Sequence, residues 1–214
     1  MAPEYFYAFD MAQQLGFSDK CLGVYKYGSS IYGTKTEKSD LDIIYIADNE
    51  KEIYEVLQSK DFPFCSGYLE KVDLHYISKE SFIKLLNEHD IMALEIYYQM
   101  RDDERLKYSF NLNLDTLRRK ISAECSNSWS KARKKLDIPE EDDYIGLKSL
   151  FHSIRILSFG RNIAKDNKID YLNVLIKNEV VKSKDFWLQL ENEYNSGFRW
   201  KEFKSKYTEI QNFN

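Results

Sequence analysis

The sequence predicts an α/β (α+β) chain in which a small mixed sheet flanked by helices is followed by an all-helical part. Short β-branched and aromatic runs occupy the first 77 residues, whereas apolar residues recur at helical spacing after Ser78. With 214 residues, 43% of them hydrophobic, the chain is long enough to bury a normal core. We place the domain boundary near residue 105, which gives one domain at 1–105 and a helical domain at 106–214.

Three runs predict strands, at residues 22–27, 41–46 and 71–77. The first run, LGVYKY, stops at Gly28-Ser29, a pair typical of a tight turn. The second, LDIIYI, fits a buried strand, and the third, KVDLHYI, alternates cleanly. Between the second and third runs, apolar residues at helical spacing predict a helix at 49–60. The expected order is therefore strand, turn, strand, helix, strand.

Helices are predicted at residues 79–87, 90–100, 114–136 and 140–163, followed by three shorter ones and no further strand. Ser78 is the expected N-cap of the first of these helices. The two longest carry continuous apolar stripes on either side of Pro139, so we expect them to pack as an antiparallel pair.

Charge and cysteine content exclude several classes of protein. A formal net charge of −4 is unlike the global basic field of a dedicated nucleic-acid binder, although a local basic groove is compatible with it. The three cysteines have no C-x-x-C spacing, which argues against a disulfide framework and a structural zinc site. No run of 18 apolar residues occurs, so we expect a soluble, cytoplasmic protein with no membrane partner.

Carboxylates begin the second predicted strand in the pattern Asp40-Leu41-Asp42. Because side chains alternate along a strand, Asp40 and Asp42 face the same side, where two like charges are costly unless a cation neutralises them. Magnesium, which prefers hard oxygen ligands, suits this position. Ten residues separate this pattern from the preceding Gly28-Ser29 pair, in which Gly28 allows a close backbone approach and Ser29 offers hydroxyl and amide donors to a phosphate.

A third carboxylate, Asp73, lies between apolar residues within the third predicted strand and shares its face with His75. If this strand lies beside the one that Asp40-Leu41-Asp42 begins, three carboxylates converge. They would hold two metal ions about 3.5 to 4 Å apart. Asp73 is then the candidate general base, with Glu70 as the next candidate.

The order Gly-Ser, ten residues, Asp-x-Asp and a later strand Asp resembles the nucleotidyltransferase superfamily of DNA polymerase β, in particular its minimal, aminoglycoside-modifying and RNA-repair-associated branches. The resemblance covers residues 22–77. It implies direct transfer of a nucleoside monophosphate from a nucleoside triphosphate such as ATP to an acceptor hydroxyl, with release of pyrophosphate. It also implies that Gly28 and Ser29 contact phosphate, and that Asp40, Asp42 and Asp73 bind magnesium or manganese within a catalytic domain at 1–105.

Basic residues gather on the two long predicted helices. Lys148, His152 and Arg155 share one face, as do Lys131 and Lys134 together with an asparagine. Of these, Lys131, Lys134 and Lys148 are our candidates for contact with nucleotide phosphates. Two alternatives stay open: a solvated face with His152 in the core, and cations that stabilise a helix C-terminus.

The sequence does not identify the acceptor, which is an RNA 3′ end, a protein or a small hydroxylated molecule. It also predicts neither the preferred base nor the oligomeric state. The alternative function is a catalytically silent nucleotide-binding or antitoxin-like partner protein, whose helical surface binds a second protein.

Overall fold

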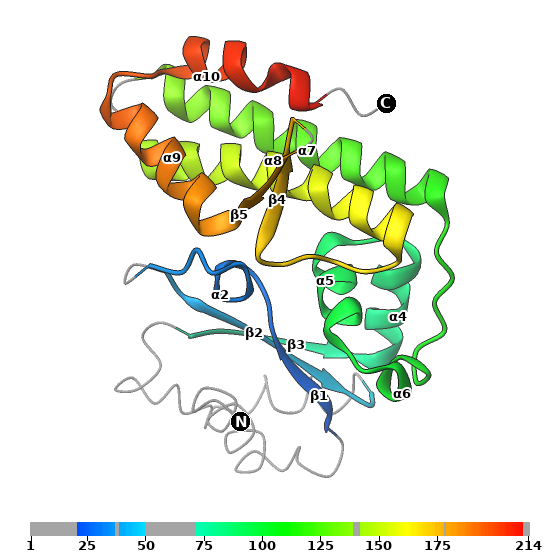
Figure 1. Cartoon of the computed structure of the whole chain (residues 1–214). Coiled ribbons are helices and arrows are strands. Elements are labelled where there is room, and N and C mark those ends of the chain that lie inside the picture. Colours follow the sequence, from blue (N-terminus) through cyan, green and yellow to red (C-terminus); the bar gives the residue numbers. More distant parts are fainter. Residues whose placement is uncertain (1–20, 37–38, 50–71, 139–141, 178, 212–214) are drawn as a thin grey trace. The chain divides into compact units, whose positions relative to one another are not determined.

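The structure, a computed structural model, describes residues 21–36, 39–49, 72–138, 142–177 and 179–211 (Figure 1). It divides into two compact units. The first contains the described residues up to Ile31 together with Lys35–Leu112, and the second contains Tyr32–Thr34 together with the residues from Asn113 onward. Within the described ranges, every helix is too short or too polar to cross a lipid bilayer.

The first unit contains a sheet of three strands in the order β1-β2-β3. The strands are β1 (Cys21–Lys26), β2 (Leu41–Ala47) and β3 (Val72–Ser78). β1 pairs antiparallel with β2, and β3 pairs parallel with it, so the predicted mixed sheet is confirmed. The central strand β2 is buried except at its second residue, Asp42, as expected for an apolar run covered on both faces. The helix predicted at 49–60 lies almost entirely outside the described residues.

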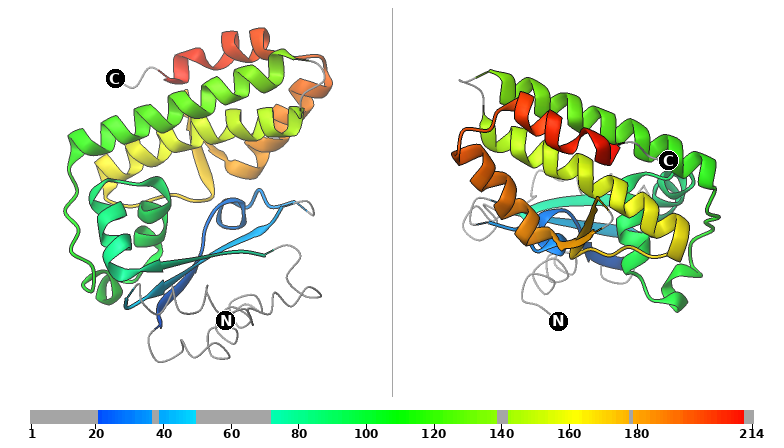
Figure 2. Two further views of the ribbon diagram at one scale, coloured as in Figure 1. Left: turned by 180° about the vertical axis from the view of Figure 1, so that it is seen from behind. Right: turned by 45° about the horizontal axis from the view of Figure 1, so that its top comes forward.

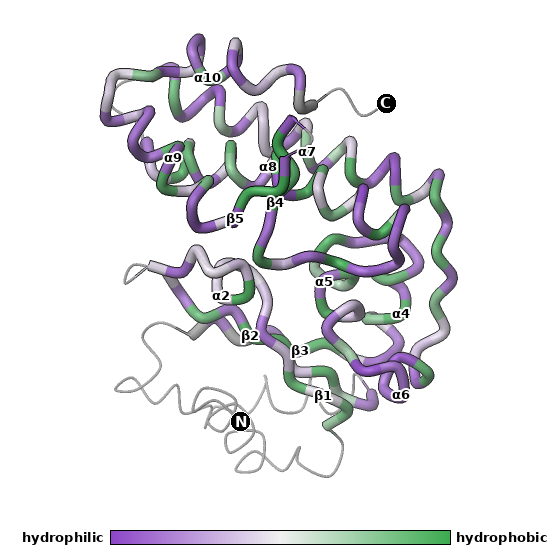
Figure 3. Tube along the Cα trace, viewed as in Figure 1, coloured by the Kyte–Doolittle hydropathy of each residue, from purple (hydrophilic) through white to green (hydrophobic). Residues whose placement is uncertain are grey.

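The short α2 (Ser29–Tyr32) lies between β1 and β2 in the chain, and its last residue belongs to the second unit. After the sheet, the first unit continues with α4 (Lys79–Asn87), α5 (Ile91–Gln99) and α6 (Asp102–Arg105). The predicted N-cap of α4 is confirmed, since the Ser78 hydroxyl accepts a hydrogen bond from the Ser81 amide at 3.1 Å. Phe82 and Leu86 of α4 are fully buried, and this helix packs against β2 and β3. By contrast, α6 is hydrophilic throughout (Figure 3).

The second unit is built on α7 (Leu114–Asp137) and α8 (Asp143–Asp166), which lie side by side (Figures 1 and 2). Gly146 lies against Leu136, whereas Gly160 lies against Ile121, so the pair is antiparallel as predicted. The helices approach closely at these glycines because no side chain keeps them apart. The predicted core stripe of α7 is also confirmed at its buried residues Leu117, Ile121, Cys125, Ala132 and Leu136.

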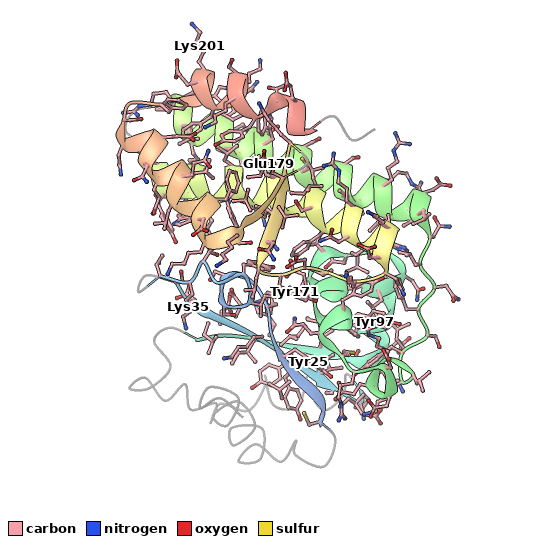
Figure 4. All side chains as sticks on the ribbon, in the orientation of Figure 1. Tyr25, Lys35, Tyr97, Tyr171, Glu179 and Lys201 are labelled. Atoms are coloured by element: carbon pink, nitrogen blue, oxygen red, sulfur yellow. The ribbon has the colours of Figure 1, made fainter. Side chains whose placement is uncertain are left out.

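One expectation for the helical part is wrong, because a two-stranded hairpin of β4 (Asn173–Ile176) and β5 (Glu179–Lys182) interrupts it. The hairpin docks on α8, where the Leu175 amide donates to the Ser158 hydroxyl at 2.8 Å and Val174 is buried. The remaining elements are α9 (Ser183–Asn195), α10 (Trp200–Tyr207) and the 3-10 helix η2 (Thr208–Gln211). Lys201 extends from α10 away from the other helices (Figure 4).

Candidate functional site

The turn after β1 lies against β2 at a glycine. The Tyr27 amide donates to the Asp42 carbonyl across 3.1 Å, which anchors the turn to the neighbouring strand. Gly28 has a φ of +66°, and a Cβ at this position would overlap the Asp42 carboxylate. The backbone of the turn and this carboxylate are therefore immediate neighbours, which requires glycine at position 28.

Two local hydrogen bonds hold the rest of the turn. The Ser30 hydroxyl donates to the Tyr27 carbonyl at 2.9 Å, and the Ile31 amide donates to the Gly28 carbonyl at 3.2 Å. Serine stabilises turns through such bonds to its own backbone. Ser29, the predicted phosphate contact, begins α2 directly after this turn and is partly buried.

Asp42 and Asp73 are register partners in the parallel pair formed by β2 and β3. Residues in register on adjacent strands point to the same face of a sheet, so the two side chains are neighbours. Asp42 is partly buried, whereas the Asp73 side chain is 59% exposed. The structure thus brings together one predicted carboxylate from each strand, and it places Gly28 directly beside the first of them.

Asp73 has a basic neighbour on its own strand. His75 Nε2 lies 3.2 Å from Asp73 Oδ1, and the two side chains are 53% and 59% exposed, respectively. The edge of the His75 ring meets the Tyr27 ring at a centroid distance of 6.0 Å. The predicted shared face of Asp73 and His75 is confirmed by this contact, which fixes one side of the Asp73 carboxylate.

Negative charge is concentrated around the Tyr27 ring. Burial, and then the charges of Asp42 and Asp73, raise the pKa of the Tyr27 hydroxyl above its ordinary value. Glu95, a buried residue of α5, adds to this effect. Such a surface favours a cation, because a cation neutralises charges that otherwise repel one another.

Asp40 is exposed and directly precedes β2. The loop before it is closed by Ser39, whose buried hydroxyl accepts a hydrogen bond from the Thr36 amide at 3.0 Å. Among the described residues, no three His, Cys, Asp or Glu side chains form a group able to hold a metal ion. Of the predicted carboxylates, Asp42 and Asp73 are the two that the strand register sets side by side. Glu70, the next candidate base, lies outside the described residues.

The predicted phosphate-binding lysines belong to the second unit. Lys131 and Lys134 are exposed on α7, and Lys148 is exposed on α8. On the same face of α8 as Lys148, Arg155 is buried to 2% exposure, and its Nη2 lies 2.6 Å from His152 Nδ1. The face of α8 predicted to carry three basic side chains therefore combines an exposed cation with a buried one.

Sequence reasoning missed two residues of the first unit that lie beside the carboxylate pair. Tyr27 directly precedes the Gly28-Ser29 pair, so its position in the motif was a signal. Glu95 is an isolated acid within the apolar run IMALEIYY, a pattern that indicates a buried carboxylate with a specific role. Neither signal shows that Tyr27 and Glu95 lie near Asp42 and Asp73, because this proximity results from the packing of α5 and of the turn after β1.

No family model and no curated protein matches the chain. Among solved structures, it is similar to the crystal structure of spectinomycin adenyltransferase AAD(9) from Enterococcus faecialis with ATP and spectinomycin. The TM-score is 0.47 and the sequence identity 13%, over 97% of this chain and 98% of that chain. A similarity of this degree shows neither a function nor a substrate for this chain.

Proposed function

We propose that this chain is a magnesium-dependent nucleotidyltransferase, which moves a nucleoside monophosphate from a nucleoside triphosphate to an acceptor hydroxyl with release of pyrophosphate. The observation that carries the proposal is the turn at Gly28 against Asp42, with Asp73 in register beside it. This arrangement sets a backbone able to approach phosphate next to two carboxylates able to bind a metal.

The residues present fit magnesium. This ion commonly uses one or two protein carboxylates and completes its octahedron with water and substrate phosphates, so Asp42 and Asp73 form a sufficient ligand pair. We propose Asp40, which is exposed and lies two residues before Asp42, as a further ligand. When bound, magnesium neutralises the triphosphate and lowers the pKa of the attacking hydroxyl.

The side chains divide the remaining tasks. Gly28 and Ser29 hold the phosphates by close backbone approach and by the amide and hydroxyl of Ser29. Asp73, the more exposed carboxylate of the pair, takes the proton from the acceptor hydroxyl as its oxygen attacks the α-phosphorus. The bond from this phosphorus to the pyrophosphate oxygen breaks in the same transfer, so no covalent enzyme intermediate forms.

The test uses each of the four α-labelled nucleoside triphosphates with magnesium or manganese, offered with total RNA, lysate protein and a small-molecule fraction. We expect label to appear in one of these acceptor classes. Asp73→Asn should lower the transfer rate about a hundredfold or more while nucleotide affinity stays within roughly tenfold, because a general base acts on the rate. Asp42→Asn should lose both, because it removes a metal ligand next to the phosphate site.

The matched control is Asp48→Asn, an exposed aspartate at the opposite end of β2, which should transfer label like the wild type. Nucleotide binding without transfer to any of the three acceptor classes would contradict the proposal and favour the silent nucleotide-binding alternative. Near wild-type transfer by Asp73→Asn would remove Asp73 from the role of base.

A further inference from the structure

The antiparallel packing of α7 on α8 brings a lysine of one helix beside a basic face of the other. A Cβ on Gly146 would lie 2.8 Å from Leu136, and one on Gly160 would lie 2.9 Å from Ile121. Residue numbers thus fall along α7 as they rise along α8. This register puts Lys131 level with the turn of α8 that runs from Lys148 to His152.

Arg155 fixes the state of the His152 ring. An arginine side chain is always a donor, so at the 2.6 Å contact between Arg155 Nη2 and His152 Nδ1 the imidazole nitrogen must accept. The ring proton is then on Nε2. Arg155 is itself held in place, because its guanidinium lies 3.5 Å from the centroid of the Tyr32 ring and 4.6 Å from that of Phe159.

Positive charge accumulates around this ring. Burial, and then the charges of Arg155, Lys148 and Lys131, lower the pKa of His152 to about 3, so the ring is neutral near pH 7. Lys131 and Lys148 are exposed, and no carboxylate among the described residues forms an ion pair with either of them. The cluster therefore combines two exposed cations with one neutral, partly buried imidazole.

We propose that Lys131, Lys148 and His152 form a binding site for the phosphoryl oxygens of a polyphosphate or phosphate ester, with Arg155 as the positioning residue. The two lysines supply charge, and His152 Nε2–H supplies a donor whose tautomer is set by Arg155. A multiply charged oxyanion matches this set because it accepts several hydrogen bonds while it compensates the cations. Lys131 and Lys148 are two of the three lysines that the sequence predicted for contact with nucleotide phosphates, and the proposal adds His152 and Arg155 to them.

The first experiment measures binding of inorganic tripolyphosphate by calorimetry, with the whole protein and a chelator that removes divalent metal. We expect Lys148→Ala and Lys131→Ala each to weaken binding by about tenfold, the effect of losing one charged hydrogen bond. The matched controls are Lys165→Ala on α8 and Arg118→Ala on α7, two exposed cations that face other sides of the same helices. Equal losses in the controls, or no loss in the two lysine variants, would overturn the site.

Two further arms identify the source of the phosphate. ATP in the chelator and an RNA oligomer without terminal phosphates are titrated in the same way. Stronger binding of ATP assigns the site to a terminal oligophosphate, and stronger binding of the oligomer assigns it to a phosphodiester. In either case the Lys148→Ala loss must recur. If Lys148→Ala weakens the binding of neither ATP nor the RNA oligomer, the site binds neither kind of phosphate and the proposal is wrong.

A second pair of variants tests the role of His152. His152→Gln keeps an N–H donor near the position of Nε2, whereas His152→Asn is too short to reach it. We expect tripolyphosphate binding close to wild type in the first variant and about tenfold weaker in the second. Ring nitrogen NMR of the wild-type protein provides a readout without mutation, and it should show Nε2 protonated and Nδ1 free of a proton near pH 7. The opposite tautomer would refute the role given to Arg155.

Failure of this proposal is distinguishable from failure of the proposed function. In the chelator, Asp48→Asn should bind tripolyphosphate like the wild type, because Asp48 is an exposed residue of the first unit that belongs to neither proposed site. If the wild type transfers no nucleotide but Lys148→Ala still weakens tripolyphosphate binding, the anion site is supported and the proposed transferase function is wrong.

Discussion

At the scale of single residues, the molecule depends on positions where no side chain fits. Gly28 has this property because its left-handed backbone and the Asp42 carboxylate both exclude a Cβ. The sequence predicted a close approach of the Gly28 backbone to a phosphate, whereas its contact with the Asp42 carboxylate results from the pairing of β1 with β2. Sequence alone did not predict the acidic surroundings of Tyr27 or the stacking of Arg155 on the Tyr32 ring, because these contacts join elements distant in the chain.

Replacement of Gly28 by alanine should damage stability and nucleotide binding together. The left-handed backbone alone costs a residue with a Cβ about 1 to 2 kcal/mol, and the methyl group must also displace the Asp42 carboxylate. Urea unfolding and calorimetry with ATP and magnesium measure the two effects. Gly33→Ala is the matched control: its φ is +70°, but its nearest neighbour is Leu172 at 3.7 Å, so it should lose similar stability and keep nucleotide affinity. Equal nucleotide affinity in both variants would show that the position of Asp42 is unimportant.

At the scale of elements, periodicity predicted the three strands of the sheet and the two long helices, because each carries a long or strongly patterned apolar stripe. It failed at the hairpin of β4 and β5. Each of these strands has four residues, and Lys177 adopts a positive φ of 47° in the turn without the glycine that usually marks one. The hairpin exists because Val174 and the Leu175 amide find partners on α8, and such docking leaves no local pattern.

The glycines between α7 and α8 lead to a prediction that opposes helix propensity. Gly160→Ala should lower the free energy of unfolding by roughly 1 kcal/mol, because overpacking against the fully buried, stiff Ile121 exceeds the gain of about 1 kcal/mol in propensity. In an Ile121→Ala background the same change should instead be stabilising, since the clash is gone. Urea unfolding of the wild type, the two single variants and the double variant provides the measurement. The same sign in both backgrounds would contradict the packing argument.

At the scale of the whole molecule, stability should depend on pH through His152. Its pKa falls from 6.5 to about 3 on folding, so between these values the unfolded chain binds a proton that the folded chain does not. The free energy of unfolding is therefore highest above pH 6.5 and falls by about 1.4 kcal/mol for each pH unit below it. Chemical unfolding from pH 7 to pH 4 measures this dependence. The free energy of unfolding should fall with this slope in the wild type but not in His152→Gln. Parallel profiles would show that His152 takes a proton equally in both states.

The assignment of Tyr32–Thr34 to the second unit has a consequence for how the chain is made. These three residues leave the ribosome early. Phe159 and Arg155, whose side chains pack on the Tyr32 ring, are synthesised long afterwards. The polypeptide enters the second unit at Tyr32, returns to the first unit at Lys35, and enters the second unit again at Asn113. Such nonlocal contacts form late in folding. A protease cut near residue 112 would therefore not release two independent fragments, because the amino-terminal piece carries part of the second unit with it.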